Sequence, residues 1–390
     1  MLPLRYSVRS FWERRSRSAL TIAVIALVVL ALGLLSGLVT SLQASTRAAG
    51  SPKNLIVLRK GATSDGASAL PLQAYQTIRF FEGIARGRDG EPLVSPEFLV
   101  QPFGATRAGE RESVLVRGVE SAAFEVHDDI RIVLGRALQP SSGEAIAGRA
   151  AASRYLGAEP GGRMALGNAS YTVVGVFEAD GSALESEIWV DARELANDVK
   201  RPSPYSSLRI RLAEGADADA LMRRIDSDAR FTLASSLESE YYEKQAASAG
   251  ALYIVVGGLA LLAGIGAAFG ATNTLYATVQ ARTREIGTLR ALGFSRAAIA
   301  SSFVLESVLI AFAGFAAGAA LAWLAAQIVS AVVGQVPLFG MGSASLISIR
   351  VGIVDLAFAF ALALAIGVGG ALLPALRAAR LRPIDALRKG

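Results

Sequence analysis

Few side chains in this sequence are of the types that do catalytic or metal chemistry. His127 is the single histidine, and it stands beside Asp128 and Asp129 in "EVHDD", a combination that could join a carboxylate-rich metal site. A single histidine excludes a multi-histidine metal site. It also excludes a Ser-His triad at any place in the protein other than the neighbourhood of His127. We expect His127 to lie in a solvated loop, and we predict no catalytic, cofactor-binding or metal-binding residues.

The sequence also has no P-loop for binding nucleotide phosphates. A P-loop needs Gly-Lys followed by Ser or Thr, because backbone amides hold the phosphates while the lysine and the hydroxyl reach phosphate and Mg²⁺. No Gly-Lys dipeptide occurs. "GIGAAFG" (residues 264–270) has the wrong spacing for a dinucleotide loop and lies in an apolar run, so its small residues indicate close helix packing, as do Gly314 and Gly318. ATP binding by a P-loop of this chain is therefore excluded.

Two carboxylates stand within apolar segments, where charge is costly. Glu306 lies about two turns into one such segment, and Asp355 opens another. One interpretation is a proton or substrate path. We favour the other, in which Glu306 lies near the cytoplasmic boundary and Asp355 near the outer one, each reaching headgroups, polar backbone or a basic neighbour such as Arg350.

The elements that must position these residues are long apolar helices. The 390 residues are 52% apolar and 18% charged, whereas about 25% are charged in a typical soluble domain. Since about 20 apolar residues cross the roughly 30 Å hydrocarbon core, we predict transmembrane helices at residues 18–42, 249–276, 299–333 and 352–374. The first run is too long for the apolar part of a cleaved signal peptide, so we interpret it as an uncleaved anchor.

The arginines predict the orientation of these helices. They cluster in an amphipathic N-terminal segment (residues 1–17), in residues 277–298 and in the tail (residues 375–390), and positive segments that flank spans stay in the cytoplasm. Both termini are therefore expected inside, and the loop 334–351 outside. Membrane topology also accounts for the net charge of +6, so we predict no nucleic acid partner.

The insertion between the first two spans, residues 43–248, is net acidic, and its sequence pattern predicts an exported α+β domain. Short strands are predicted at residues 54–58, 113–119, 171–177 and 207–212, and helices at 70–84 and 217–229. We expect two subdomains, about 43–105 with 200–248 and 106–199, and "KRPSPYSS" marks the crossing between them. "SLESEYYEKQ" (residues 236–245) predicts a helix that runs on into the second span. With no cysteine, the domain has no disulfides.

The cytoplasmic segment "ARTREIGTLRALGFSRAAI" (residues 281–299) predicts a short helix against the membrane. Ile286, Leu289 and Leu292 form an apolar stripe between charged positions. Gly293 is placed to cap the end of this helix, and Ser295 to cap the start of the next. An apolar stripe with defined ends indicates a docking element for another protein. A helix that merely lies in the membrane interface is the alternative.

Several segments resemble the membrane subunit of the MacB/FtsX superfamily of ABC transporters. They are "NTLYATVQARTREIGTLRALGFSRAAI", "FVLESVLIAFAGFAAG", "GALLPALRAARLRPIDALR" and the N-terminal "SVRSFWERRSRSALTIAVIAL". The pieces "LGRAL", "GEAIAGRAAASRYLG" and "YTVVGVFEADG" resemble the MacB-type periplasmic core domain. The resemblance implies a bacterial inner-membrane protein with four transmembrane helices, one before the periplasmic domain and three after it.

The resemblance also implies a function. Such a chain is a non-enzymatic permease subunit that works as a homodimer, with a heterodimer as the alternative, and a separate cytoplasmic ATPase dimer binds ATP and Mg²⁺. ATP-driven closure is coupled to periplasmic movement for adaptor-linked efflux of a periplasmic cargo; lipoprotein extraction and regulation of a cell-wall hydrolase are the alternatives. The implied coupling residues are Arg284, Glu285, Ile286, Gly287, Leu289, Arg290, Ala291, Leu292 and Gly293.

Overall fold

The chain folds into two compact units. The computed structural model describes residues 15–201, 205–248, 250–332, 336–340, 343–347 and 349–381. One unit, here called the helical domain, comprises Met1–Thr40, Ala251–Ala331 and Ile349–Gly390; the other, the sheet domain, comprises Ser41–Gly250 and Val332–Ser348. Most of the predicted N-terminal segment and of the tail, and Pro202 and Pro204 of the predicted crossing, lie outside the described residues.

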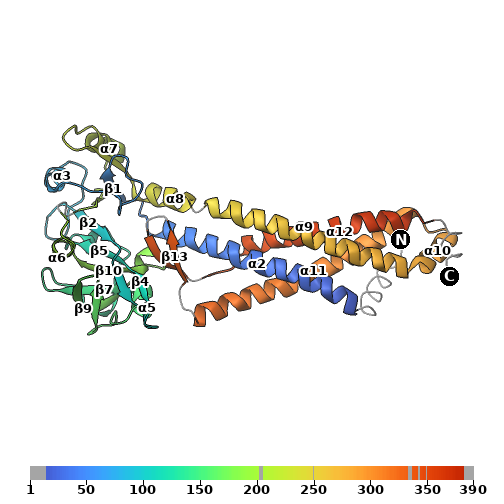
Figure 1. The fold of residues 1–390 in the computed structure, drawn as a ribbon. Coiled ribbons are helices and arrows are strands. Elements are labelled where there is room, and N and C mark those ends of the chain that lie inside the picture. The colour runs from blue at the N-terminus through green and yellow to red at the C-terminus, as the bar shows by residue number, and fades with distance from the viewer. Residues whose placement is uncertain are drawn as a thin grey trace. The chain divides into compact units, whose positions relative to one another are not determined.

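The helical domain is a bundle of long helices joined by one short helix (Figure 1). Its elements are α2 (Arg15–Ala48), α9 (Gly250–Ala281), α10 (Thr283–Ala291), α11 (Arg296–Val332) and α12 (Ile353–Ala379). Four helices of the described chain are long and apolar enough to cross a membrane. Each of them overlaps one of the four predicted runs.

Glycines set the close approach of these helices. A Cβ on Gly314 would lie 2.8 Å from the Cβ of Ile25, and one on Gly318 would lie 2.6 Å from the carbonyl oxygen of Ala26, so α2 packs directly on the backbone of α11. The prediction that these two glycines allow close packing is confirmed. Among the glycines of "GIGAAFG", Gly264 lies at a helix contact, where a Cβ would be 3.2 Å from Leu362, and Gly266 and Gly270 have no such neighbour within 4 Å.

A mixed ten-stranded sheet forms the centre of the sheet domain, in the order β12-β1-β11-β2-β5-β10-β7-β9-β6, with β8 paired to β9. The pairs β5–β10 and β7–β9 are parallel, and the other pairs are antiparallel. The strands are β1 (Asn54–Arg59), β2 (Val94–Val100), β5 (Leu115–Val119), β6 (Arg131–Gly135), β7 (Glu144–Gly148), β8 (Arg163–Leu166), β9 (Ala169–Glu178), β10 (Glu187–Asp191), β11 (Ser207–Arg211) and β12 (Leu233–Leu237). All four predicted strands are present.

Short helices and two further strand pairs complete the sheet domain. The helices are α3 (Leu72–Ile78), α4 (Ala123–Val126), α5 (Arg149–Arg154), the 3-10 helix η1 (Ala183–Ser186), α6 (Ala192–Asp198), α7 (Ala218–Asp226) and α8 (Glu238–Ser248). Strands β3 (Phe103–Ala105) and β4 (Arg111–Ser113) form one pair, and β13 (Val336–Gly340) and β14 (Ser343–Ile347) form the other. The segment predicted as a loop at 334–351 thus contains a β-hairpin.

Of three apolar cores along the described sheet, two lie on one face of it. Leu55, Val57, Leu208 and Ile210 pack in the first with α3 and α7. The second gathers residues of the opposite half of the sheet, among them Phe98, Val116, Ile188 and Val190. Helix α7 lies within the predicted helix 217–229: Asp217 accepts a hydrogen bond from the Ala220 amide at 3.0 Å, and Leu221 and Ile225 are buried. The predicted helix at 236–245 begins only at Glu238, because Ser236 and Leu237 belong to β12.

Candidate functional site

Helix α10 is a short, sharply bounded helix between α9 and α11. Gly293 follows its end with a φ of +91°, a conformation that favours glycine. The amides of Gly293 and Phe294 donate to the carbonyls of Arg290 and Leu289, each at 3.2 Å. Ser295 accepts a hydrogen bond at its Oγ from the Ala298 amide at 3.1 Å, at the start of α11. Both predicted caps are confirmed.

One side of α10 is closed by the helical domain. Ile286 is 3% exposed and packs in a cluster with Leu275, Val279, Ile299 and Phe303, together with alanines of α12. The expectation that Ile286 shares a partner-facing stripe with Leu289 and Leu292 is therefore wrong, because Ile286 fills the core of its own domain. The period of a short amphipathic helix identifies an apolar side without saying which neighbour covers it.

The other side of α10 is open. Leu292 is 72% exposed, whereas Leu289 is half-buried. Further exposed residues of the segment are Arg284, Glu285, Thr288, Ala291 and Gly293. The described structure therefore leaves a small surface of one leucine, small residues and charges on which a partner could dock. The assignment of this segment to ATPase coupling stays a prediction.

Arg282 anchors the beginning of α10. Its side chain is buried, and its Nη1 donates to the Glu306 carboxylate of α11 at 3.2 Å. Its Nε donates to Glu285 in the first turn of α10 at 3.1 Å, and its guanidinium carbon lies 5.9 Å from the centre of the Phe303 ring. Glu306 therefore reaches a basic neighbour, as we favoured from the sequence. The pair ties α10 to α11.

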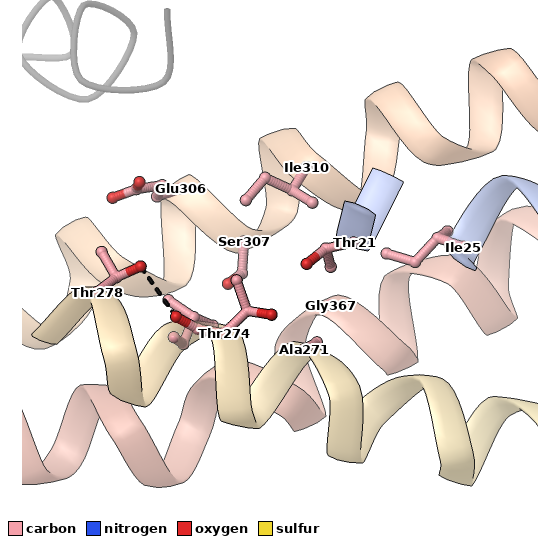
Figure 2. Close-up of a pocket in the computed structure, with 10 residues that line it drawn as sticks. Thr21, Ile25, Ala271, Thr274, Thr278, Glu306, Ser307, Ile310 and Gly367 are labelled. Carbon is pink, nitrogen blue, oxygen red and sulfur yellow. Dashed lines mark hydrogen bonds between the residues drawn. The ribbon is translucent and has the colours of Figure 1, made fainter. Parts of the chain in front are cut away.

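A small cavity lies beside Glu306 (Figure 2). Its volume is about 20 Å³, room for about one water molecule. Thr21, Thr274, Thr278 and Ser307 supply hydroxyl groups to its lining, and the Thr278 hydroxyl donates to the Thr274 carbonyl at 3.0 Å. The cavity is far smaller than the several hundred Å³ of a typical ligand pocket. It is not a site for a drug-sized cargo.

Asp355, the second carboxylate in an apolar segment, caps a helix. Its Oδ2 accepts hydrogen bonds from the Gly352 amide at 2.9 Å and from the Thr40 hydroxyl at 3.2 Å. An acidic side chain in the first turn also interacts favourably with the helix dipole of α12. The backbone contact agrees with the favoured interpretation of Asp355, and the named Arg350 contact is not needed to explain its burial.

The sheet domain contains a second and larger group of buried charges, here called the buried charge cluster. It consists of Arg117, Arg209, Asp65, Glu97, Glu187 and Glu238, with His127 at its border. Its members on β2, β5, β10 and β11 project from the sheet face opposite the two apolar cores. Every one of them is at most 7% exposed. A buried charge is tolerable only when it is paired and hydrogen-bonded.

Arg209 uses its whole guanidinium group in this cluster. Its Nε donates to Glu238 at 2.8 Å, and its Nη2 donates to the Tyr242 hydroxyl at 3.0 Å and to Asp65 at 3.3 Å. Its Nη1 donates to Glu97 and, at 3.1 Å, to the Ser207 hydroxyl. A guanidinium has five N–H donors, so each of them has an acceptor.

Glu97 joins the two arginines. Its Oε2 accepts from Arg209 and from the Nη1 of Arg117 at 2.7 Å, while Arg117 also binds Glu187 in a bidentate pair at 2.6 and 2.5 Å. Burial by itself raises the pKa of Glu97, but the neighbouring Arg209, His127 and Arg117 outweigh burial and hold that pKa well below its usual range. Glu97 is therefore a carboxylate at neutral pH.

His127 is not in a solvated loop, so that expectation is wrong. The side chain is 2% exposed, its Nε2 lies 2.7 Å from Glu97 Oε1, and its ring lies edge-on to Trp189 at 5.2 Å between centroids. Asp128 next to it pairs instead with Arg211 at 3.1 Å. No group of three or more metal-ligating side chains that could hold a metal ion occurs among the described residues.

Sequence reasoning missed the buried charge cluster, although one signal was present. In "SLRIRL" the arginines alternate with Leu208 and Ile210, which normally indicates a strand with one solvated face. The structure covers that face with α8, whose Glu238 and Tyr242 supply acceptors. The signal was an alternating arginine pattern, but the acceptor Glu238 lies 29 residues beyond Arg209 in the chain, so a local pattern does not identify it.

Two family models match the chain. The MacB-like periplasmic core domain matches residues 18–228, and the FtsX-like permease C-terminal domain matches residues 257–383. The described structure agrees with this division, since the first match contains most of the sheet domain and the second contains α10, α11 and α12. The segment predicted to couple to an ATPase lies within the FtsX-like part.

Individual relatives are similar over part of their length. The macrolide export ATP-binding/permease protein MacB of Shewanella sp. (strain ANA-3) is 29% identical over 236 residues, which cover 57% of this chain and 34% of that protein. The uncharacterized ABC transporter permease YknZ of Bacillus subtilis (strain 168) is 36% identical over 136 residues, or 34% of this chain and 30% of that protein. The chain thus matches about a third of the length of these curated relatives.

Among solved structures, the periplasmic region of MacB from Actinobacillus actinomycetemcomitans aligns with a TM-score of 0.39 at 13% identity, over 51% of this chain and 94% of that structure. The extracellular domain of the noncanonic ABC-type transporter YknZ from Gram-positive bacteria aligns with a TM-score of 0.36, also at 13% identity, over 47% of this chain and 99% of that structure. From its two matching family domains, the chain belongs to the MacB/FtsX family of ABC transporter permeases.

Proposed function

We propose that this chain is the permease subunit of a transporter in which a separate cytoplasmic ATPase drives movement of the sheet domain on the other side of a bacterial inner membrane. In this arrangement α2 is the first span, the sheet domain follows it in the periplasm, and α9, α11 and α12 are the other three spans. The arginine-rich segments at both termini and around α10 support cytoplasmic ends.

The observation that best supports this proposal is the two-sided character of α10. Its inner side is fixed by Ile286 and by the buried Arg282–Glu306 pair, while its outer side presents the exposed Leu292. The exposed leucine and the charges around it form a surface on which a partner could dock. If α10 docks against an ATPase, a movement of the ATPase would displace α10. The Arg282–Glu306 pair would then transmit this displacement directly to α11.

The partners follow from this role. We infer a permease homodimer, or a heterodimer with a related chain, bound to an ATPase dimer that holds ATP and Mg²⁺. The MacB relatives are named as macrolide exporters, which supports outward movement of a cargo. We further infer a periplasmic adaptor as a partner. Lipoprotein extraction and control of a cell-wall hydrolase use the same movement, and the protein that copurifies with the complex would distinguish the three.

The test is a charge placed on the outer side of α10. In Leu292→Asp the helical domain should fold normally, and ATPase binding should fall at least about tenfold, because about 1.4 kcal/mol suffices for that factor. Ala297→Asp is the matched control, since it adds the same charge at an exposed position in the first turn of α11, where a carboxylate suits the helix dipole. Copurification of the ATPase and ATP hydrolysis by the complex are measured. If Leu292→Asp binds and hydrolyses like the parent, α10 is not the coupling helix.

A further inference from the structure

Helix α8 is the last element of the sheet domain before the second long apolar helix. It begins at Glu238, directly after β12, and ends at Ser248, and α9 begins at Gly250. In the described sheet, β12 is an edge strand whose neighbour is β1. Movement of α8 that passed through β12 alone would reach the sheet only at this edge.

The buried charge cluster provides a second connection. Glu238 accepts from Arg209 of β11 at 2.8 Å, and its other oxygen accepts from Asn54 of β1 at 2.9 Å and from the Ser51 amide at 3.3 Å. One turn further along α8, Tyr242 accepts from the same Arg209 at 3.0 Å. The first turns of α8 are therefore bonded to the two strands next to the edge strand and to the loop before β1.

The connection continues into the far half of the sheet. Arg209 shares the Glu97 carboxylate of β2 with Arg117 of β5, and Arg117 holds Glu187 of β10 in a bidentate pair. Asp65 lies within 3.4 Å of both arginines and adds a second bridge between them. Charge-assisted hydrogen bonds thus run without interruption from α8 across β11, β2 and β5 to β10.

Such a connection resists sliding. Any displacement of α8 along the sheet would leave a buried guanidinium or carboxylate without its partner. The guanidinium is also a planar fork with fixed donor directions, and each donor of Arg209 has an acceptor. Helix α8 and the sheet must therefore move together.

We propose that the Arg209–Glu238 pair is the joint through which movement of α8 is passed to both halves of the sheet domain. This inference rests on the proposed function, because it names the residues that receive the ATP-driven movement at the sheet-domain end. Arg209, Glu238 and Tyr242 act as positioning residues: they carry displacement and take no part in chemistry.

Distances between spin labels test the joint in the full chain bound to its ATPase. The chain contains no cysteine, so label pairs can be introduced cleanly at exposed alanines. Ala165→Cys on β8 with Ala247→Cys on α8 measures whether the far half of the sheet stays fixed to α8. Ala165→Cys with Ala281→Cys at the end of α9 measures whether the sheet domain moves when ATP is added.

In the otherwise unchanged protein, the 165–247 distance should stay narrow and constant, while the 165–281 distance should change with ATP. In Glu238→Gln the 165–247 distribution should broaden, and the ATP-driven change at 165–281 should fall by about half or more. Tyr242→Phe, which removes one hydroxyl, should show the same effects more weakly. Glu112→Gln is the matched control, because Glu112 binds Arg154 in a bidentate pair at 2.8 and 2.6 Å elsewhere in the domain.

The outcomes separate this inference from the proposed function. If Glu238→Gln and Tyr242→Phe keep a narrow 165–247 distribution and the full 165–281 change, the joint is wrong. If the parent protein shows no ATP-dependent change at 165–281, the proposed function fails, and the 165–247 pair still decides whether Glu238 fixes α8 to the sheet. Equal broadening in Glu112→Gln would overturn the special role of Arg209–Glu238.

Discussion

Arg282 and Glu306 meet at 3.2 Å across 24 residues of the chain, and their side chains are only 8% and 7% exposed. One stands at the start of α10 and the other two turns and more inside α11, so the pair closes the segment between them into a loop held at both ends. Glu285, which also binds Arg282, is 51% exposed. The same arginine thus has one buried and one solvated carboxylate partner, so the stability that each contact contributes can be compared directly.

Removal of the buried partner should cost much more stability than removal of the solvated one. Glu306→Ala leaves a buried guanidinium without its buried carboxylate, a change that typically costs about 3–5 kcal/mol. Glu285→Ala removes a solvent-screened contact worth about 0–1 kcal/mol. Thermal unfolding of the two variants in the same detergent gives the comparison. Equal losses would show that the Arg282–Glu306 pair is not a stabilising contact.

Ile286 and Leu292 should respond in opposite ways to truncation. Ile286→Ala creates a cavity between α10 and its neighbours and should destabilise the helical domain by about 2–5 kcal/mol. Leu292→Ala should change stability by no more than about 0.5 kcal/mol, because the residue is exposed, yet it should weaken ATPase binding. Unfolding midpoints and ATPase pull-down are measured on both variants. A stable Ile286→Ala chain would contradict the packing described for α10.

Two nearby glycines of α12 should tolerate alanine very differently. A Cβ on Gly367 would lie 2.7 Å from the Cβ of Ala311, whereas one on Gly369 has no heavy-atom neighbour within 4 Å. Alanine favours a helix over glycine by about 1 kcal/mol, so Gly369→Ala should be neutral or stabilising. Gly367→Ala should lower the unfolding temperature, because α11 must move away. The reverse order would mean that α11 and α12 do not pack at Gly367.

Acid should weaken the sheet domain through Glu97. The pKa of this carboxyl is lowered in the folded state, so its stabilisation is fully present above its unfolded pKa of about 4.3 and is lost as the pH falls through the folded value. Burial raises the pKa of Asp129, which acts in the opposite sense. Denaturant unfolding of the parent and of Glu97→Gln between neutral pH and pH 3 isolates the Glu97 contribution. The variant should be less stable at neutral pH and should lose less stability on acidification.

The proposed topology can be checked by cysteine labelling of a chain that has no native cysteine. Single cysteines at Ala105 and Gly340 should react with a membrane-impermeant reagent added outside the inner membrane. Cysteines at Ser295 and Gly390 should react only after the membrane is opened. Labelling of Ser295 from outside would show that the orientation inferred from the arginines is wrong.

Features with a local cause were predictable from the sequence. The four long helices follow from apolar runs, and Gly293 and Ser295 follow from the backbone and side-chain requirements of helix ends. The strands were predictable because successive side chains of a strand point to opposite faces of the sheet, so apolar and polar residues alternate in the sequence. The side of α10 that faces the core was not predictable, because it depends on Leu275, Phe303 and other residues far from α10 in the sequence.

The buried charge cluster depends still more on distant contacts. Arg209 and Glu97 lie 112 residues apart, and Asn54 and Glu238 lie 184 residues apart, so neither pair falls within a local window of the sequence. An arginine in an alternating strand is normally solvated, and a histidine between acidic residues normally lies at the surface. The placement of α8 and α4 over the sheet turns these residues into an interior cluster.

The alternation of charge and apolar side chains on β11 has a consequence for strand assembly. If β11 slipped by one residue against its neighbours, Arg209 would enter the apolar core and Ile210 would replace it among the carboxylates. Both changes are costly, so competing alignments are poorly populated while the chain folds. Arg209 therefore marks the correct register of β11 in a ten-stranded sheet whose neighbouring strands come from distant parts of the sequence.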